Sequence, residues 1–238
     1  MSFAVVYGVL THFIFAVAVT VMSIGLYTGL SSGWGRLDGW LAVLANLLLL
    51  VQFPIVHSYL LSTQGRKVLS RLSPMRLGAD LAPTSFVLFA SLQLIMTFVL
   101  WSPSGVVLGG NEFERWLFRA FFVGSWIFLL KSLADAGLGL QTGYIGWVSV
   151  ARGKPVDYGA FPTSGLFRFC RHPVYLGFAL VLWTAPVHTF DGLLLAVIWS
   201  AYCVIAPRFK EERYLKWHGD SYRLYRDSVP YMIPRFRG

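Results

Sequence analysis

Four long apolar runs, separated by short polar loops, dominate the first half of the chain. They cover Phe3 to Leu30, Leu41 to Leu61, Leu81 to Trp101, and Trp116 to Leu130. An α-helix needs about 20 predominantly apolar residues to cross a bilayer. The pattern therefore predicts four membrane-spanning helices within residues 1–134, with ends that the pattern places only to within several residues.

The second half of the chain follows a different pattern. An amphiphilic loop at residues 131–171 contains seven glycines and no continuous apolar run. Two shorter apolar runs follow, Val174 to Val187 and Leu193 to Ala206, and a polar, aromatic and basic tail begins at Pro207. Each run is short for a full crossing. The two either cross as a tilted helical hairpin or enter and leave on the same side.

The composition supports a membrane protein over a soluble one. Of the 238 residues, 56% are hydrophobic and only 13% are charged. We therefore predict an all-α, polytopic membrane bundle of about six spans with a cytoplasmic C-terminal region. The net charge of +9 favours contact with a membrane surface rather than nucleic acid, because the basic residues flank the apolar runs. The two cysteines, Cys170 and Cys203, have no metal-ligand or redox spacing and are expected to be small buried apolar residues.

Lysine and arginine are concentrated in alternate loops, which predicts the orientation. With the N-terminus inside, residues 62–81 hold four, residues 131–171 hold five and the tail holds eight, which is 17 of the 20 basic residues. Both termini are then cytoplasmic, and we expect the chain in a bacterial inner membrane.

The stretch Arg-His-Pro-Val-Tyr-Leu-Gly-Phe at residues 171–178 carries the first candidate chemistry. Pro173 suits the first position of a helix, and its ring pushes His172 out of the α-helical conformation. A helix that begins there offers free backbone amides beside two basic side chains, which attracts carboxylates and phosphates. An interfacial membrane anchor is the alternative.

Three other features are candidates for a site. Glu211, Glu212 and Arg213 follow the last apolar run and suit an ammonium group or a ribose diol, although paired carboxylates at a surface are more often only solvated. Tyr222 and Tyr225 are three residues apart, so they share a helical face that either stacks on a base or anchors in the interface. His57 lies inside the second span, with Arg66 after it, and is either functional or a structural hydrogen-bonding residue.

These motifs resemble the membrane methyltransferase superfamily, which includes isoprenylcysteine carboxyl methyltransferases and phospholipid methyltransferases. The similarity lies in RHPVYLGF, in the later EER, and in GDSYRLYRDSVPYMIP. Further strings, such as HSYLLSTQGRK and WSPSG, are similar to the methanethiol S-methyltransferase and NnrU-like branch. The loop at 135–150 departs from that branch, because it reads AGLGLQTGYIGW where a Phe-Gly-Leu-Arg-Gln-like string is expected.

The resemblance implies a methyltransferase that uses S-adenosyl-L-methionine to methylate a small thiol, such as methanethiol, giving a methyl thioether such as dimethyl sulfide. It implies N-terminal transmembrane helices on the acceptor side at residues 1–134 and a cofactor-binding module at residues 135–238. No metal is expected, and the partners are a small hydrophobic thiol or lipid acceptor and membrane lipids, not nucleic acid. The catalytic candidates are His57, His172 and Arg66. The cofactor-binding candidates are Arg171, His172, Pro173, Tyr175, Gly177, Glu211, Glu212, Arg213, Tyr222 and Tyr225.

Three alternatives stay open on the sequence. The acceptor is a lipid or an isoprenylcysteine-type group. The chain is an NADPH-dependent membrane reductase, although such enzymes usually have more than six spans. Or it is a non-enzymatic NnrU-like membrane protein or small transporter, which would more often carry charges within its spans.

Overall fold

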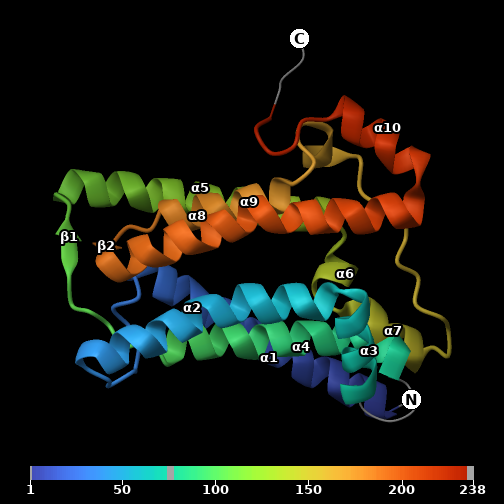
Figure 1. Cartoon of the computed structure of the whole chain (residues 1–238), viewed down its shortest axis with the longest axis horizontal. Helices are drawn as coiled ribbons and strands as arrows, with labels where there is room; N and C mark the ends of the chain where they lie inside the picture. Colours follow the sequence, from blue (N-terminus) through green and yellow to red (C-terminus); the bar gives the residue numbers. More distant parts are fainter. Residues whose placement is uncertain (1, 74–77, 235–238) are drawn as a thin grey trace. The chain divides into compact units, whose positions relative to one another are not determined.

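A computed structural model describes residues 2–73 and 78–234 (Figure 1). Residues 74–77 of the predicted basic loop and the last four residues of the predicted tail lie outside the described residues. The described chain is almost entirely helical, and five of its helices are long and apolar enough to cross a membrane. The prediction of a polytopic membrane helical bundle is confirmed. The chain forms two compact units: residues 1–106 with 138–158, and residues 107–137 with 159–238.

The first unit is built around the long helix α4. Its elements are α1 (Ser2–Tyr27), α2 (Gly39–Leu61), α3 (Thr63–Leu72), α4 (Gly78–Val99), α6 (Leu138–Gln141) and α7 (Tyr144–Ala151). α4 packs against α1, α2, α3 and α7 (Figure 1). These helices pair their polar side chains with one another, since a bilayer offers no water to satisfy them. The side-chain amides of Gln52 and Gln93, for example, join α2 to α4 with a 2.7 Å hydrogen bond from Gln93 Nε2 to Gln52 Oε1.

The loop after residue 137 is fastened to α4 through Thr84. The fully buried Thr84 hydroxyl donates a 2.7 Å hydrogen bond to the Gly143 carbonyl and accepts a 3.0 Å bond from the Trp147 backbone N–H. Gly143 has φ +72°, and a Cβ there would lie 2.9 Å from the Thr84 Cα, so this close approach requires glycine. The loop that departs from the resembling family is thus packed on the N-terminal helices.

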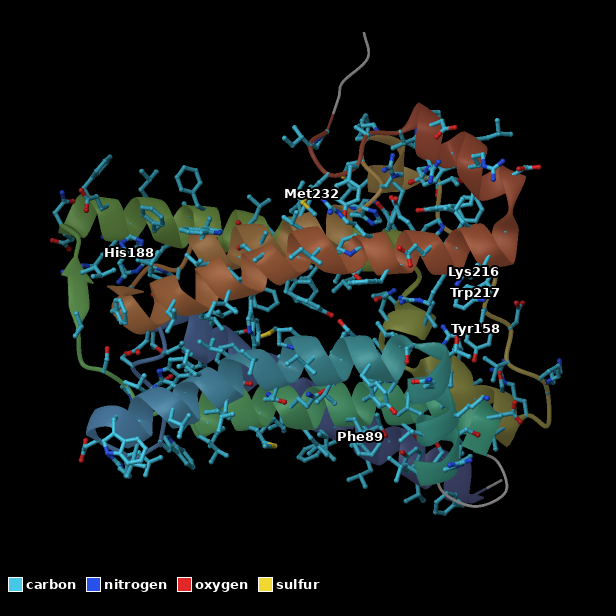
Figure 2. All side chains as sticks on the ribbon, viewed as in Figure 1. Phe89, Tyr158, His188, Lys216, Trp217 and Met232 are labelled. Atoms are coloured by element: carbon cyan, nitrogen blue, oxygen red, sulfur yellow. The ribbon has the colours of Figure 1, made fainter. Side chains whose placement is uncertain are left out.

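The second unit contains β1 (Val107–Gly109), α5 (Glu112–Asp135), the 3₁₀ helix η2 (Gly165–Arg168), α8 (Pro173–Trp183), β2 (His188–Thr189), α9 (Phe190–His218) and α10 (Asp220–Ser228). α8 packs against both α5 and α9, and α10 packs on α9 (Figure 1). β1 and β2 pair antiparallel, with Val107 opposite Thr189. In Figure 2, His188 marks the β-strand end of α9, and Lys216 and Trp217 mark its other end.

The segment from α8 to β2 runs antiparallel along α5. Gly177 packs on Leu129, the Thr184 hydroxyl donates to the Ser125 hydroxyl at 3.2 Å, and the His188 ring lies 4.4 Å from the Phe118 ring, centroid to centroid. As the residue number rises from 177 to 188, the contacted residue of α5 therefore falls from 129 through 125 to 118. α8 itself has only 11 residues, and residues 184–189 continue its path along α5.

Two short spans were predicted from the apolar pattern, and the structure has α8 and α9 at their positions. α8 is short as expected, whereas α9 has 29 residues and continues past Ala206 to His218. It continues because the polar residues after Pro207 include lysine, arginine, glutamate and leucine, which are good helix formers. The compact units also divide the chain differently from the two domains expected at residue 134, since α5 packs with C-terminal elements and residues 138–158 pack with N-terminal ones. The functional roles of those domains stay a prediction.

Candidate functional site

Glu211 gathers two side chains that lie 39 and 40 residues earlier in the chain. Its Oε1 accepts a 2.7 Å hydrogen bond from Arg171 Nε and lies 2.8 Å from His172 Nε2. The side chains of Arg171 and Glu211 are each 12% exposed, and that of His172 is 2% exposed. An ion pair so shielded from water is screened much less than a surface pair. α9 and the start of α8 thus meet at one buried carboxylate.

The Arg171 guanidinium also holds the C-terminal segment in place. Its Nη1 donates to the carbonyl oxygens of Arg226 at 2.5 Å and Val229 at 2.6 Å, and the Arg171 backbone N–H donates to the Pro230 carbonyl at 2.9 Å. The rigid donor fork of arginine suits such simultaneous contacts. With these donors engaged, Arg171 is best described as a structural clamp between α8, α9 and the end of α10.

His172 caps the start of α8 in a non-helical conformation, with φ −128° and ψ 51°, and Pro173 takes the first helical turn as the sequence predicts. Burial lowers the pKa of the His172 imidazole, and the Glu211 carboxylate only partly offsets this. The ring is therefore neutral near pH 7. In the tautomer that donates from Nε2 to Glu211, Nδ1 is unprotonated, and this buried atom has no hydrogen-bond partner in the described chain.

An aromatic cluster, defined as Tyr214, His218, Tyr222 and Tyr225, lies beside this carboxylate and surrounds the Phe161 ring. The Phe161 centroid is 5.0 Å from that of His218, 5.2 Å from Tyr222 and 5.6 Å from Tyr225. The cluster comes from the last turns of α9 and from α10. Tyr225 also donates its hydroxyl to the Phe167 carbonyl at 2.8 Å. Phe161 itself lies in the irregular segment before η2.

A cavity of about 10 Å³ lies between the buried charges and the aromatic cluster. That is room for about one water molecule. Its lining consists of Phe161, Pro162, Phe167, Arg171, His172, Lys210, Tyr214, Tyr222 and Tyr225. The Lys210 ammonium lies 5.2 Å from the Tyr214 ring centroid and 6.0 Å from that of Tyr175, which are cation–π distances. Among the described side chains, no carboxylate forms a salt bridge with it.

The structure brings together part of the predicted set. Arg171, His172, Tyr222 and Tyr225 line the cavity, Glu211 bonds the first two, and Tyr175 contacts Lys210. The remaining C-terminal candidates lie elsewhere, since Glu212 is exposed, Arg213 is half-buried, Pro173 is buried at the helix start and Gly177 packs on Leu129. A Cβ at Gly177 would lie 3.0 Å from the Leu129 Cα, which indicates helix packing.

The other two predicted residues belong to the first unit. The His57 ring is half-buried between Phe53 and Phe86, with centroids 4.9 and 4.8 Å away. Arg66 is exposed on α3. His57 lies on α2 and Arg66 on α3.

Sequence reasoning missed Phe161, Lys210, Tyr214 and His218. The signal for the last three was their spacing, because residues four apart share one face of a helix. That signal is visible only when the helix is extended beyond Ala206. In the described residues, no group of three or more His, Cys, Asp or Glu side chains is arranged to hold a metal ion.

Residues 70–229 match the family model described as "Protein of unknown function (DUF1295)", which is well over half of the chain. The chain belongs to this family. Curated relatives named methanethiol S-methyltransferase include those of Mycobacterium tuberculosis (30% identical, covering 81% of this chain and 78% of the relative) and Crocosphaera subtropica (29%, 81% and 75%). Nurim of Mus musculus is 27% identical over 78% of each chain. No solved structure matches the chain. These relatives confirm the resemblance to membrane methyltransferases that the RHPVYLGF and EER motifs indicated.

Proposed function

We propose that this membrane protein is a methyltransferase that uses S-adenosyl-L-methionine and methylates a small thiol such as methanethiol. The observation that carries the proposal is the similarity to relatives named methanethiol S-methyltransferase over 81% or more of the chain. The chemistry of the cavity agrees with it, because one buried carboxylate, one lysine and several aromatic rings complement an amino acid joined to a nucleoside.

Each part of such a cofactor has a matching side chain. Glu211 suits the ammonium group or the ribose hydroxyls, and Lys210 suits the carboxylate, since its ammonium has aromatic rings rather than a carboxylate beside it. Tyr222 and Tyr225 suit the flat base. Arg171 and His172 hold the Glu211 side chain in one position, so we assign both a positioning role. The backbone amides at the start of α8 remain a second candidate for the carboxylate.

The bound cofactor supplies an electrophilic methyl group on a sulfonium. The chain must in turn supply a deprotonated acceptor, because the thiolate is the nucleophile and a thiol of pKa about 8.5 is only a few per cent ionised at neutral pH. We propose that His57 accepts the thiol proton at a ring nitrogen and that Arg66 adds positive charge that favours the thiolate. The rings of Phe53 and Phe86 on both sides of His57 hold its ring in place. The methyl acceptor enters from the lipid in this proposal.

Binding measurements on purified protein in detergent test the cofactor. We expect micromolar affinity for S-adenosylmethionine in the wild type and a loss of about tenfold or more in Glu211→Gln, since a buried charge-assisted contact contributes about 1.5–3 kcal/mol. Glu212→Gln is the matched control, because this neighbouring carboxylate is exposed. Binding of NADPH in place of S-adenosylmethionine would contradict the proposal. Release of dimethyl sulfide from a host supplied with methanethiol distinguishes the thiol from a lipid acceptor.

Substitution at His57 tests the proposed proton acceptor. We expect His57→Ala to lower turnover by about 10²-fold or more, the usual contribution of general base catalysis, while the dissociation constant of the cofactor stays within about twofold. His188→Ala is the control, because that ring packs on Phe118 in the other unit. Unchanged turnover in His57→Ala would remove His57 from the mechanism.

A further inference from the structure

We infer that the aromatic cluster is a subsite for the purine ring of the ligand and that Phe161 is a gate that occupies this subsite until the ligand enters. The inference rests on the proposed function, and it adds a second state of the site. Phe161 and the aromatic cluster both belong to the second unit.

The first support is the geometry around Phe161. Its ring meets His218 and Tyr222 edge to face, at interplanar angles of 62° and 86°, and it lies tilted by 42° and 45° against Tyr214 and Tyr225. Four aromatic side chains thus enclose a fifth flat ring. Edge-to-face and offset contacts are the arrangements that aromatic rings prefer. A purine ring would make the same kinds of contact, because every base has a π face.

The second support is the set of charges beside the Phe161 ring. Lys210, Arg171 and His172 line the same cavity as Phe161. Arg171 and His172 both bond Glu211, whereas Lys210 forms no salt bridge with a carboxylate among the described side chains, and burying a charge is costly unless it has a partner. A ligand site combines apolar and aromatic walls with a few convergent polar groups. The Phe161 ring therefore lies inside a ligand site.

The third support is size. With Phe161 in place the cavity has only about 10 Å³. A nucleoside needs far more room than the single water that such a cavity holds. The Tyr222 side chain is fully packed and Arg171 is clamped by backbone carbonyls, so these walls have little freedom to move. Phe161 and Pro162 are the lining residues on an irregular segment, and in this inference the departure of the Phe161 ring opens the site.

The segment that carries Phe161 is built to move. Residues 154–160 have no regular secondary structure and, apart from Val156, their side chains are exposed. Gly153 and Gly159 both have φ +63°, with nothing within 4 Å of an added Cβ. Glycines in such a backbone conformation absorb large changes in φ and ψ at low cost, and hinges of this kind accompany loop motion around ligands.

A gate of this kind lowers the apparent affinity for the ligand. The observed dissociation constant equals the intrinsic one divided by the fraction of molecules in which the site is open. Removing the Phe161 ring should therefore tighten binding. If Phe161 were instead a wall on which the base stacks, removing it would weaken binding. The sign of the change separates the two arrangements.

The first experiment measures S-adenosylmethionine binding to the full-length protein in detergent. We expect the dissociation constant to fall by about fivefold or more in Phe161→Ala, which corresponds to a closed state favoured by about 1 kcal/mol. Phe161→Leu, which keeps an apolar side chain but no ring, should show a smaller decrease in the same direction and guards against misfolding of the alanine variant. Phe209→Ala is the control, because Phe209 on α9 is 52% exposed, and its affinity should not change. Unchanged or weaker binding in both Phe161 variants overturns the gate.

The second experiment does not require methyl transfer or cofactor binding by the wild type. At a concentration tenfold above its dissociation constant for Phe161→Ala, adenosine should raise the melting temperature of that variant by about 2–4 °C. It should raise that of the wild type, which binds about fivefold more weakly, by about half as much. An absent shift in Phe161→Ala, or an equal shift in the wild type, overturns the inference. If no variant binds S-adenosylmethionine, the proposed function fails, and the adenosine result still decides whether the cluster is a gated purine subsite.

Discussion

At the scale of single residues, the site depends on Glu211 and its two donors. Arg171 donates hydrogen bonds from its side chain to Glu211 and to two backbone carbonyls of the C-terminal segment. Loss of one partner from a buried pair leaves an uncompensated charge, at a cost of about 3–5 kcal/mol. The exposed pair between Arg223 and Asp220 on α10 contributes far less, because water screens it. Charge alone therefore does not identify the important basic residues of the tail, and burial does.

The neutral, buried His172 predicts how stability depends on pH. Its pKa in the folded protein lies below the ordinary value of about 6.5, so between these two values the unfolded chain binds a proton that the folded chain does not. The stability that the neutral His172 contributes is fully present above about pH 6.5. It is lost as the pH falls through the pKa of His172 in the folded protein. Each unit of that difference is worth about 1.4 kcal/mol.

The measurement is the melting temperature in detergent between pH 7.5 and pH 5.5. The wild type should lose stability toward pH 5.5 more steeply than His172→Gln, which keeps an N–H donor for Glu211 but does not titrate. The other four histidines contribute equally to both proteins, so the difference between the two curves isolates His172. Parallel curves would mean that His172 titrates normally in the folded state.

At the scale of helices, the contact between α5 and α8 sets the position of the residues that begin the site. Gly177 lets the two backbones approach, because a Cβ there would meet the Cα, Cβ and Cδ1 atoms of Leu129 at 3.0–3.2 Å. We expect Gly177→Ala to destabilise the protein by about 1–3 kcal/mol, the cost of overpacking. Cofactor affinity should fall with it, because Pro173 and His172 lie one turn before Gly177 on the same helix.

The control for that prediction is a second glycine, which lies on α5. Gly124 on α5 has nothing within 4 Å of an added Cβ, so Gly124→Ala should be neutral or stabilising by up to about 1 kcal/mol. Thermal unfolding of both variants in one detergent gives the comparison. Equal melting temperatures for the two variants would show that α8 can move away from α5 without cost.

The α5 contacts also bear on the number of crossings. Five helices are long enough to span, and α8 is not. Because residues 177–188 follow α5 from Leu129 to Phe118, the short helix and the extended residues after it together traverse the apolar length that α5 covers. A sixth passage through α8 stays a prediction, which the distribution of lysine and arginine also makes.

At the scale of the whole molecule, the basic loops predict that both termini lie on the cytoplasmic side of the membrane. Single cysteines at Ser104 and Lys154, both exposed, test this in whole cells with a membrane-impermeant maleimide. Ser104→Cys should react from outside, and Lys154→Cys only after the membrane is permeabilised. The two native cysteines are buried and contribute little background. The reverse pattern of labelling would invert the orientation.

The fold could be predicted from sequence where a single physical rule decides the outcome. Apolar length located the long helices, the fixed φ of Pro173 located the start of α8, and the spacing of Tyr222 and Tyr225 placed both on α10. The apolar pattern ended this helix at Ala206, because hydropathy cannot detect a helix that continues beyond its apolar residues into polar ones. Lys210, Tyr214 and His218 were missed for that reason.

Other features of the site depend on tertiary contacts that leave no local pattern. The family resemblance predicted Arg171, His172 and Glu211 as members of one site, but not the direct bonds between them, since some 40 residues separate them. Phe161 lies in an irregular segment with no periodicity, and its place inside the aromatic cluster follows only from the packing of α9 and α10. The packing of residues 138–158 on α4 likewise depends on the Thr84 hydroxyl. Nothing in the sequence indicates that this hydroxyl bonds two residues of the loop.

The buried thiol next to His172 has a consequence for an enzyme that methylates thiols. Cys170 is 1% exposed, and burial raises its pKa, an effect that the His172 backbone N–H only partly offsets. A protonated thiol is a poor nucleophile. Cys170 immediately precedes two residues of the proposed cofactor site, yet it is held in its unreactive form and out of reach of solvent. In the proposed function, the protein would thus keep a sulfur atom beside a methyl donor without becoming its own substrate.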